Sequence, residues 1–509
     1  MLAKVTSGAL IGINAYPVTV EVDIAQGLPQ FATVGLPEGA VKESKDRVKS
    51  AIKNSGYEFP ARRITINLAP ADIRKDGAAF DLPIAIGLLA ATGVVNAERL
   101  EKFILLGELS LDGQVKPVRG VLPIAVVARD WGDLALILPI DNAEEGAVVA
   151  GPAIYPVRDL AEAVALINGE KEFTPFVMPP ATATALQTAD SEDFAEVRGQ
   201  EHVKRALEVA AAGSHNILMS GPPGSGKTML ARRLPTILPD FSFEEALETT
   251  KIHSVAGLLS RNKALVRQRP FRSPHHTISD AGLIGGGSYP RPGEVSLAHR
   301  GILFLDEFPE FKKNVLEMLR QPLEDGQVCI SRAALSLTYP ADFMLVAAMN
   351  PCPCGFMGDT VHDCTCTPPL LQRYRSKLSG PLLDRIDLHV EVPRVTHKDL
   401  TEIAAGEASS AIRERVNHAR NRQRTRLAPF GLHANSQMQA RHIRKFCKLD
   451  PQGDALLEQV TDKLGLSARS YTRILKLALT IADLAGSEQI ERFHLSEAIQ
   501  YRGLDRKTG

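Results

Sequence analysis

The chain has 509 residues, equal numbers of basic and acidic residues (59 Lys and Arg, 59 Asp and Glu) and a hydrophobic content of 44%, and this length predicts about three globular domains. Six cysteines exclude a disulfide framework, no run approaches 18 uninterrupted apolar residues and the first residues lack a signal peptide, so we expect a cytoplasmic protein that does not cross a membrane. The charge is uneven: residues 1–180 carry 17 Lys and Arg against 22 Asp and Glu, a net of −5, so the remainder carries +5, which permits a local surface for nucleic acid.

The first part of the chain, residues 1–175, is predicted to be an α+β domain. Alternating apolar residues in VTVEVDI (18–24) indicate a half-buried strand, and a helix is predicted to begin near Pro37. Residues 176–192 are rich in Pro, Thr and Ala without periodicity, which predicts a linker. Two further strands are predicted in this part, in RITINLA (63–69) and FILLGELSLDG (103–113).

The second part, residues 193–395, is predicted to be an α/β core with a parallel sheet. Three nearly continuous apolar runs each lead into a loop, as expected of central strands covered on both faces. Helical patterns dominate from residue 396 to residue 509. The three apolar runs are NILMS (216–220), GILFLDE (301–307) and FMLVAAMN (343–350).

GPPGSGKT, residues 221–228, fits the phosphate-loop pattern G-x-x-x-x-G-K-[ST] and lies between a predicted strand and a predicted helix. Glycines let backbone N–H groups turn toward phosphate, and the following helix adds its positive end. We expect Lys227 on the β- and γ-phosphates and Thr228 on Mg²⁺. A chance glycine-rich turn is the alternative, and the strand–loop–helix context argues against it. The remaining nucleotide-binding candidates are Gly221, Pro222, Pro223, Gly224, Ser225 and Gly226.

Polar residues at the tips of the other strands complete the expected ATP site. Asp306 is expected to hold Mg²⁺, and Glu307 to position or deprotonate the attacking water, although two solvated carboxylates are the alternative. Asn350 could orient the water or could form an ordinary turn. Arg385, in SGPLLDRIDLHVEV, either supplies positive charge to the γ-phosphate during transfer or pairs with a neighbouring aspartate.

The order GPPGSGKT, LFLDE, MN and LLDR resembles the AAA+ ATPases, and PFRSPHHTISDAGLIGGG, beginning at Pro270, narrows the resemblance to their magnesium-chelatase-like branch. The whole chain resembles the bacterial ComM/YifB family, whose members pair this ATPase with an N-terminal Lon-protease-like domain of the ribosomal protein S5 domain 2-like fold. The resemblance implies a C-terminal helical lid and a ring, usually a homo-hexamer. It also implies that Arg385 acts on the nucleotide of a neighbouring subunit. Arg469, in LSARSYTRILKLA, matches the family's second sensor arginine, and Arg473 is a weaker candidate.

The N-terminal part departs from a Lon-type protease at the two residues that carry the chemistry. RKDGAAFDLPIAIGLL and GELSLDGQVKPVRGVLPIAVVA resemble the two catalytic segments, but Ala79 occupies the position of the nucleophilic serine and Leu122 that of the lysine. Without a nucleophile and its base there is no acyl transfer. We therefore expect a retained fold used for assembly or binding.

Basic stretches mark candidate contacts with DNA. Residues 324–343, EDGQVCISRAALSLTYPADF, are predicted to form a hairpin with Arg332 close to its tip. Residues 411–426, AIRERVNHARNRQRTR, form either a solvated basic helix or a DNA contact, and the sequence leaves both open. His275-His276 is not expected to bind metal, because no further ligand set lies nearby. Residues 261–300 contain only two acids against seven basic residues: Arg261, Lys263, Arg267, Arg269, Arg272, Arg291 and Arg300.

The segment MNPCPCGFMGDTVHDCTCTPP (349–369) holds two C-x-C pairs directly after Asn350. Four thiolates in a compact loop, with glycines for tight turns, suit a closed tetrahedral Zn²⁺ site of structural type. His362 could replace one thiol. Disulfides are the alternative, which a reducing cytosol disfavours. The predicted ligands are Cys352, Cys354, Cys364 and Cys366.

These features predict an ATP-driven ring motor that acts on single-stranded or branched DNA, and the resemblance implies branch migration or helicase work during recombination of incoming DNA in natural transformation. The alternatives are a magnesium-chelatase-like ATPase subunit and a protein-remodelling ATPase. Ala79 and Leu122 argue against a protease, and Glu307 argues against a non-hydrolysing switch. The polarity, the preferred DNA structure, the ring size and any protein partners do not follow from the sequence.

Overall fold

The computed structural model describes residues 1–36, 39–71, 73, 75, 77–132, 134–178, 192–259, 264–287, 290–332, 335–359, 361–395, 406–464 and 467–502. It divides into two compact units, each made of two separate stretches of the chain. Most of the predicted linker, 179–191, lies outside the described residues. The first unit comprises Met1–Gln187 and Ala246–Arg267, and the second comprises Thr188–Glu245 and Gln268–Gly509.

The first unit is built on a mixed sheet whose described strands run in the order β3-β4-β2-β1-β5-β8-β9. β1 and β2 form a long antiparallel hairpin, with Val5 opposite Val20, and β2 also pairs antiparallel with β4. The remaining neighbours are parallel. The bounds are β1 (Leu2–Ile11), β2 (Asn14–Ala25), β3 (Gln30–Val34), β4 (Arg63–Ala69), β5 (Phe103–Leu105), β8 (Ala135–Pro139) and β9 (Ile154–Val157).

Helix α2 (Asp81–Ala91) forms the centre of this unit, and every one of its residues is buried. Its sequence, DLPIAIGLLAA, has no polar face, so the helix can only lie inside the core. Gly87 allows close packing on β2, because a Cβ there would lie 2.7 Å from Val22 Cγ2. Asp81 is satisfied by Arg47 of α1 (Gly39–Asn54), with 2.7 Å between Oδ2 and Nε. Further helices are α3 (Ala97–Leu100), α4 (Val121–Ala128), α5 (Ala143–Ala147) and α6 (Leu160–Asn168).

The second unit contains a parallel sheet in the order β11-β14-β17-β10-β18. The three apolar runs of the sequence are its three central strands, and every residue of these strands is buried. The prediction of a parallel α/β core is therefore confirmed. The strands are β11 (Phe271–Arg272), β14 (Ile302–Leu305), β17 (Met344–Met349), β10 (Ile217–Ser220) and β18 (Leu388–Glu391).

Between β11 and β17 the chain forms two small additions to the sheet. The first contains α10 (Asp280–Ile284) and the short pair β12 (Gly285–Gly286) and β13 (Arg291–Pro292). The second is the predicted hairpin, formed by β15 (Gln327–Arg332) and β16 (Leu335–Pro340). The two additions touch, because the Tyr339 hydroxyl donates to the Pro290 carbonyl at 2.8 Å. The side chain of Arg332 lies outside the described residues.

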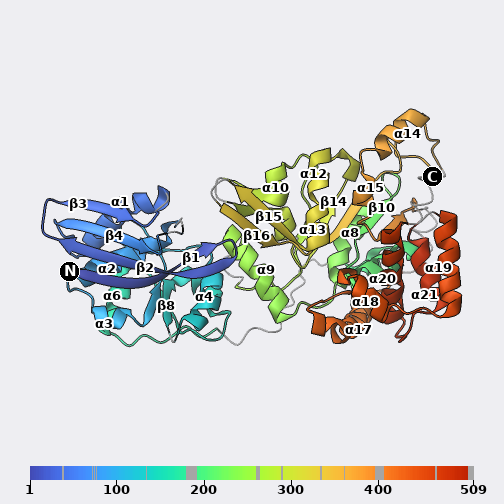
Figure 1. Cartoon of the computed structure of the whole chain (residues 1–509). Coiled ribbons are helices and arrows are strands. Elements are labelled where there is room, and N and C mark those ends of the chain that lie inside the picture. The colour runs from blue at the N-terminus through green and yellow to red at the C-terminus, as the bar shows by residue number, and fades with distance from the viewer. Residues whose placement is uncertain are drawn as a thin grey trace. The chain divides into compact units, whose positions relative to one another are not determined.

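The C-terminal part is helical as predicted, and Figure 1 shows its helices grouped together at the orange-to-red end of the chain. Helix α17 (Ser409–Leu427) packs against α7 (Glu201–Gly213) of the α/β core and against α20 (Ala468–Leu484). The buried residues of the sheet, α7 and these helices form one continuous hydrophobic cluster. The remaining helices are α18 (Ala440–Phe446), α19 (Pro451–Leu464) and α21 (Arg492–Gln500).

Candidate nucleotide-binding site

The phosphate loop connects β10 to α8 (Lys227–Arg233) and depends on its glycines. Gly224 and Gly226 have φ angles of 77° and 89°, which side chains disfavour. A Cβ at Gly221 would collide with the carbonyl oxygen of Val392. The local sequence therefore produces a tight loop whose end meets the N-terminus of a helix, which is the geometry that binds phosphate.

Lys227 is buried and folded back onto this loop. Its Nζ donates to the carbonyl oxygens of Gly221 at 2.7 Å and Pro222 at 2.9 Å, and it lies 3.3 Å from Oδ1 of Asn350. Burial lowers the pKa of Lys227, and the charge of Asp306 partly opposes that shift. The structure thus brings the predicted phosphate-binding lysine and the predicted water-orienting asparagine together.

The two predicted Mg²⁺ ligands touch each other. The Thr228 hydroxyl donates to Oδ2 of Asp306 at 2.6 Å. A hydroxyl and a carboxylate converging beside a phosphate loop are a donor set that fits Mg²⁺. This contact places the ends of β10 and β14 at the same edge of the sheet, as the parallel topology requires.

A cavity of about 340 Å³ opens beside these groups. It is large enough to take a polyphosphate, and it contains acids and bases in equal number. Sequence reasoning missed three of its residues, Arg373, Tyr374 and Lys377, which come from α14 (Pro368–Arg375) and the turn after it. The basic stretch LQRYRSK was the available signal. The charged lining residues are Lys227, Asp306, Glu307, Glu310, Arg373 and Lys377.

Gln200 is a further residue that sequence reasoning missed. It precedes α7 with a left-handed backbone (φ 58°), and its Nε2 donates to the carbonyl oxygens of Ser225 and Pro393, both at 2.9 Å. It therefore ties the phosphate loop to the segment after β18. The only available signal was a polar residue directly before a predicted helix.

Glu307 also has a left-handed backbone, with φ 51°, and its N–H donates to Oδ1 of Asp306 at 2.9 Å. Its carboxylate oxygen Oε2 lies 3.1 Å from Nδ1 of His276. The histidine pair therefore contacts the candidate general base.

Arg385 is buried and pairs with Glu324, not with a neighbouring aspartate, and its Nη1 donates to the Pro381 carbonyl at 2.7 Å. Its Nε is buried without a partner among the described residues. Arg469 is exposed and acts electrostatically on the same Glu324, lowering its pKa after the larger effect of the Arg385 hydrogen bond. Among the described residues that line the cavity, neither arginine appears.

The weaker candidate, Arg473, has a structural role. It pairs with Asp387, which also lies 3.3 Å from Nδ1 of His215. Burial alone would raise the pKa of Asp387, but Arg473 and His215 outweigh that effect and hold the pKa below its usual value. The guanidinium of Arg473 is therefore engaged in an ion pair that joins α20 to the sheet.

The four cysteines of the two C-x-C pairs converge. Their sulfurs all lie within 4.8 Å of one another, with Cys352 Sγ 3.3 Å from Cys354 Sγ and 3.7 Å from Cys364 Sγ. A tetrahedral ion with Zn–S distances of about 2.3 Å holds its sulfurs about 3.8 Å apart, so the cluster fits Zn²⁺. Backbone N–H groups also point at the sulfurs, such as Met357 N–H to Cys352 Sγ at 3.3 Å. His362 packs edge-on against Phe356.

The thiols do not ionise alike. The backbone N–H of Phe356 is the main cause that lowers the pKa of Cys354 to about 6. For Cys366, the N–H of Cys354 acts to lower the pKa, but desolvation and the neighbouring thiols outweigh it and raise the pKa to about 12. One thiolate therefore opposes the ionisation of the next, and a dication would be needed for all four to ionise together.

This cysteine loop packs directly on the phosphate loop. A Cβ at Gly355, where φ is 87°, would lie 2.6 Å from Cδ of Pro223. Cys352 lines the nucleotide cavity, and the Tyr374 hydroxyl donates to the Asn350 carbonyl at 3.0 Å. The cysteine loop thus packs on Pro223, and α14, which follows it, holds the backbone of Asn350.

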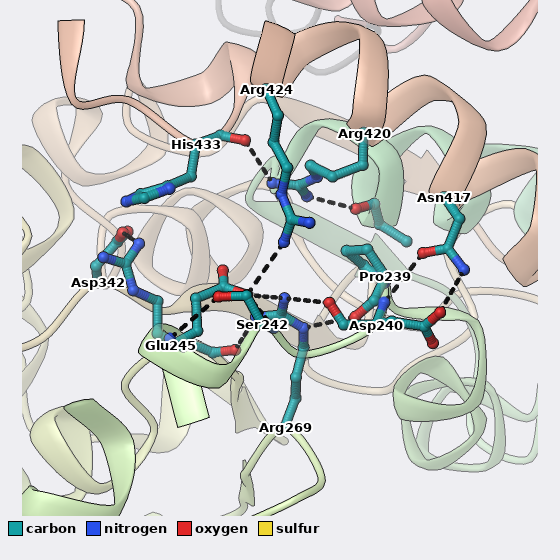
Figure 2. A network of polar contacts seen from close by, with 12 residues as sticks. Pro239, Asp240, Ser242, Glu245, Arg269, Asp342, Asn417, Arg420, Arg424 and His433 are labelled. Atoms are coloured by element: carbon teal, nitrogen blue, oxygen red, sulfur yellow. Dashed lines mark hydrogen bonds and ion pairs between the residues drawn. The ribbon is translucent and has the colours of Figure 1, made fainter. Parts of the chain in front are cut away.

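Arg269 and Arg272, two of the arginines predicted to contact DNA, are engaged in intramolecular pairs. Arg269 is nearly buried: Nε donates to the Pro239 carbonyl at 2.8 Å and Nη2 to Glu245 at 2.9 Å (Figure 2). Arg272 makes a two-pronged pair with Glu294, at 2.6 and 2.7 Å. The guanidinium of Arg269 is therefore not available to a phosphate backbone, whereas the Arg272 side chain is paired but 34% exposed.

The arginines of α17 are also largely structural. Figure 2 shows Arg424 reaching Glu245 from above and Arg420 donating to the His433 carbonyl. Burial lowers the pKa of Arg420 to about 9. These contacts fasten α17 to the α/β core, an arrangement that neither interpretation of this stretch, a solvated helix or a DNA contact, had included. The other paired arginines are Arg415, with Glu208 and Glu407, Arg422, with the carbonyls of Gly486 and Ser487, and Arg426, with Asp483.

In the first unit, the two positions that a Lon-type protease would use carry apolar side chains in the fold. Ala79 lies in a 3-10 turn (Ala78–Phe80), where its carbonyl accepts from the Gly107 N–H at 3.0 Å. Leu122 is fully buried in α4. Within the described residues no helix combines the length and the apolar character needed to cross a membrane.

Comparison with known proteins covers nearly the whole chain. Three family models match: "Magnesium chelatase, subunit ChlI" over residues 193–400, "Subunit ChlI of Mg-chelatase" over 20–142, and "Magnesium chelatase, subunit ChlI C-terminal" over 406–502. The chain is 46% identical over 507 residues to the uncharacterized protein YifB of Escherichia coli, covering 99% of this chain and 98% of that protein. It is 45% identical over 512 residues to the competence protein ComM of Haemophilus influenzae, with the same coverage. A magnesium-chelatase 38 kDa subunit of Rhodobacter capsulatus is 26% identical over 235 residues, 43% of this chain and 63% of that protein.

Proposed function

We propose that this chain, which belongs to the ComM/YifB family of magnesium-chelatase-like ATPases, is an ATP-hydrolysing AAA+ ring motor that acts on DNA. One observation supports the ATPase part: Lys227, Asp306, Glu307 and Asn350 line one cavity. Asp306 also accepts a hydrogen bond from the Thr228 hydroxyl. The DNA part rests on the relative named as a competence protein. We infer branch migration or helicase work on single-stranded or branched DNA.

The residues divide the chemistry between them. The loop N–H groups and Lys227 bind the phosphates, and Lys227 exchanges its carbonyl partners for phosphate oxygens. Thr228 and Asp306 would hold Mg²⁺, which neutralises charge on the phosphates. Glu307 accepts the proton of the attacking water, and Asn350 orients that water from the neighbouring strand.

Arg385 is proposed to act on the nucleotide of a neighbouring subunit, and Arg469 is proposed to be the second sensor arginine of the helical lid. Both lie near Glu324 and outside the lining of their own cavity. A cation placed on the far side of the γ-phosphate stabilises the charge of the transition state. This arrangement requires a closed assembly, and we propose a homo-hexamer.

We propose one structural Zn²⁺ per chain, held by Cys352, Cys354, Cys364 and Cys366. All four positions of a tetrahedral ion would be filled by sulfur, so the site is structural and not catalytic. The cytoplasm, where we expect the protein to act, keeps such thiols reduced and able to bind metal.

The first unit is proposed to be a Lon-like domain that serves assembly or binding and not proteolysis. Ala79 and Leu122 offer neither a nucleophile nor a base.

A second candidate is a chelatase-type ATPase subunit or a protein-remodelling ATPase, favoured by the ChlI family models and the magnesium-chelatase relative. The ATPase rate measured alone and with single-stranded, duplex or branched DNA separates the two. We expect stimulation by DNA, strongest with single-stranded or branched forms. A rate that no DNA changes but that a protein partner raises would establish the second candidate instead.

A further inference from the structure

A small cavity of about 30 Å³ lies within the second unit, where α17 meets the α/β core. Ser214 at the end of α7, Met344 of β17 and Arg420 of α17 are among the residues that line it. A cavity of this size has room for about two or three water molecules or one small inorganic ion. Figure 2 shows the polar contacts between several of its lining residues. Among the described residues, the lining contains three arginines and two acids: Arg269, Arg300, Arg420, Glu245 and Asp342.

Both acids of this cavity are already paired. Oε2 of Glu245 lies 2.9 Å from Nη2 of Arg269 and 3.3 Å from Nη2 of Arg424. Oδ2 of Asp342 lies 2.8 Å from Nη1 of Arg300. The two carboxylates therefore already serve three guanidinium groups, and the fourth arginine of the network is left to other groups.

Arg420 is that fourth arginine, and it is only 8% exposed. Its Nη2 donates to the Ala211 carbonyl at 2.9 Å and its Nη1 to the His433 carbonyl at 3.3 Å. Its Nε is buried and has no hydrogen-bond partner among the described residues. Burial, and after it the charge of Arg269, lowers the pKa of Arg420 to about 9, so the guanidinium keeps its positive charge at neutral pH. A buried charge that lacks a counter-charge is costly, and carbonyl dipoles offset only part of this cost.

We propose that this cavity binds one small monovalent anion of the size of chloride, which is the counter-ion of Arg420. Arg424 is 37% exposed, so water balances its charge, and the excess that remains inside is a single positive charge. An anion that accepts from Nε would satisfy both this N–H group and the buried charge.

The anion would strengthen the joint between α17 and the α/β core, because both contribute to the lining. None of the described residues that line this cavity also lines the nucleotide cavity. The inference therefore goes beyond the proposed ATPase function and does not depend on it.

The test measures the unfolding temperature of the full chain while chloride replaces gluconate, an anion too large for the cavity, at constant ionic strength. Chloride at ten times its Kd should raise the unfolding temperature of the wild type by about 2–4 °C, and the rise should saturate. Arg420→Met should fold, because an apolar chain often replaces a buried charge at little cost, and its unfolding temperature should not respond to chloride. Arg415→Met is the matched control. Arg415 lies on the same helix and pairs with Glu208, but it is 43% exposed, so this variant should respond to chloride like the wild type.

Bromide locates the site directly in the wild-type protein and does not require a variant that folds. Crystals grown in bromide, at the concentration that saturates the stabilisation, should show an anomalous peak in the cavity beside Arg420 Nε. An unfolding temperature that is equal in chloride and gluconate, together with the absence of this peak, would overturn the inference. Equal responses to chloride in the wild type and in Arg420→Met would also overturn it, because the stabilising anion would then bind elsewhere.

Discussion

Two glycines in the cysteine loop allow a matched test of its coupling to ATP. Gly355 and Gly358 both have positive φ, 87° and 79°, so alanine costs about 1–2 kcal/mol of backbone strain at either position. Their surroundings differ. A methyl group at Gly355 would lie 2.6 Å from Pro223 Cδ and 2.8 Å from Cγ, whereas one at Gly358 meets nothing within 4 Å. Only Gly355→Ala therefore pushes on the phosphate loop.

The difference in ATP affinity between Gly355→Ala and Gly358→Ala measures the effect of the contact with Pro223, because both variants carry the same backbone strain. Overpacking by one methyl group costs about 1–3 kcal/mol, and the rigid Pro223 ring transmits it to the loop that binds phosphate. At about 1.4 kcal/mol per factor of ten, Gly355→Ala should weaken ATP binding about tenfold, while Gly358→Ala should bind ATP like the wild type. Both should show similar losses of thermal stability from strain.

Titration with a fluorescent ATP analogue measures the affinity, and thermal unfolding and zinc content serve as controls for folding. Equal ATP affinity of the two variants, with both folded, would refute the claim that the cysteine loop positions the phosphate loop. A tenfold loss shared by both would show that strain, and not the contact with Pro223, is responsible.

Three further outcomes are expected. Glu307→Gln should bind ATP normally and hydrolyse it about a hundredfold more slowly, and near-normal turnover would sink its assignment as the base. Arg385→Ala should be inactive alone yet partly rescued in mixed rings with Lys227→Ala, because some interfaces then keep both wild-type halves; no rescue after verified mixing would count against action in trans. Replacing Cys364 and Cys366 with Ser should release the metal and lower ATPase activity more than nucleotide binding. Less than a tenth of an equivalent of zinc in wild-type protein purified under reducing conditions without chelator would rule the site out.

The groups that the sequence predicted at one site are those that strand topology must bring together. Lys227, Asp306 and Asn350 each follow a buried run, and the carboxyl ends of parallel strands meet at one edge of a sheet. Short, contiguous motifs record this geometry in the sequence. The cysteine cluster was predictable for the same reason, since two C-x-C pairs in one loop can converge without help from distant elements.

The misses share a different cause. Nothing in the spacing of His276 or Arg373 ties them to the phosphate loop, because their positions depend on the path of an insertion and of α14. The number of arginines in a stretch was a poor guide to DNA contacts for a related reason. A count of charges does not show whether a guanidinium faces water or a buried carbonyl oxygen. Arg269 and Arg420 lie among backbone oxygens inside the protein, and only tertiary packing determines that. Likewise, residues 246–267 belong to the first unit, and no change of composition along the sequence marks this assignment.

The elements around the cavity contact different groups, and this separates their expected effects. The cysteine loop contacts Pro223 of the phosphate loop, so its disturbance should appear first in ATP affinity. Glu307 is the candidate base, so its replacement should lower kcat while ATP binding stays normal. Arg385 lies outside the lining of its own cavity, so its loss should change neither property within one subunit and should act only across an assembled interface. A general loss of stability would lower ATP affinity, kcat and activity across the interface together. Variants that each change only one of these properties therefore indicate a direct contact and not unfolding.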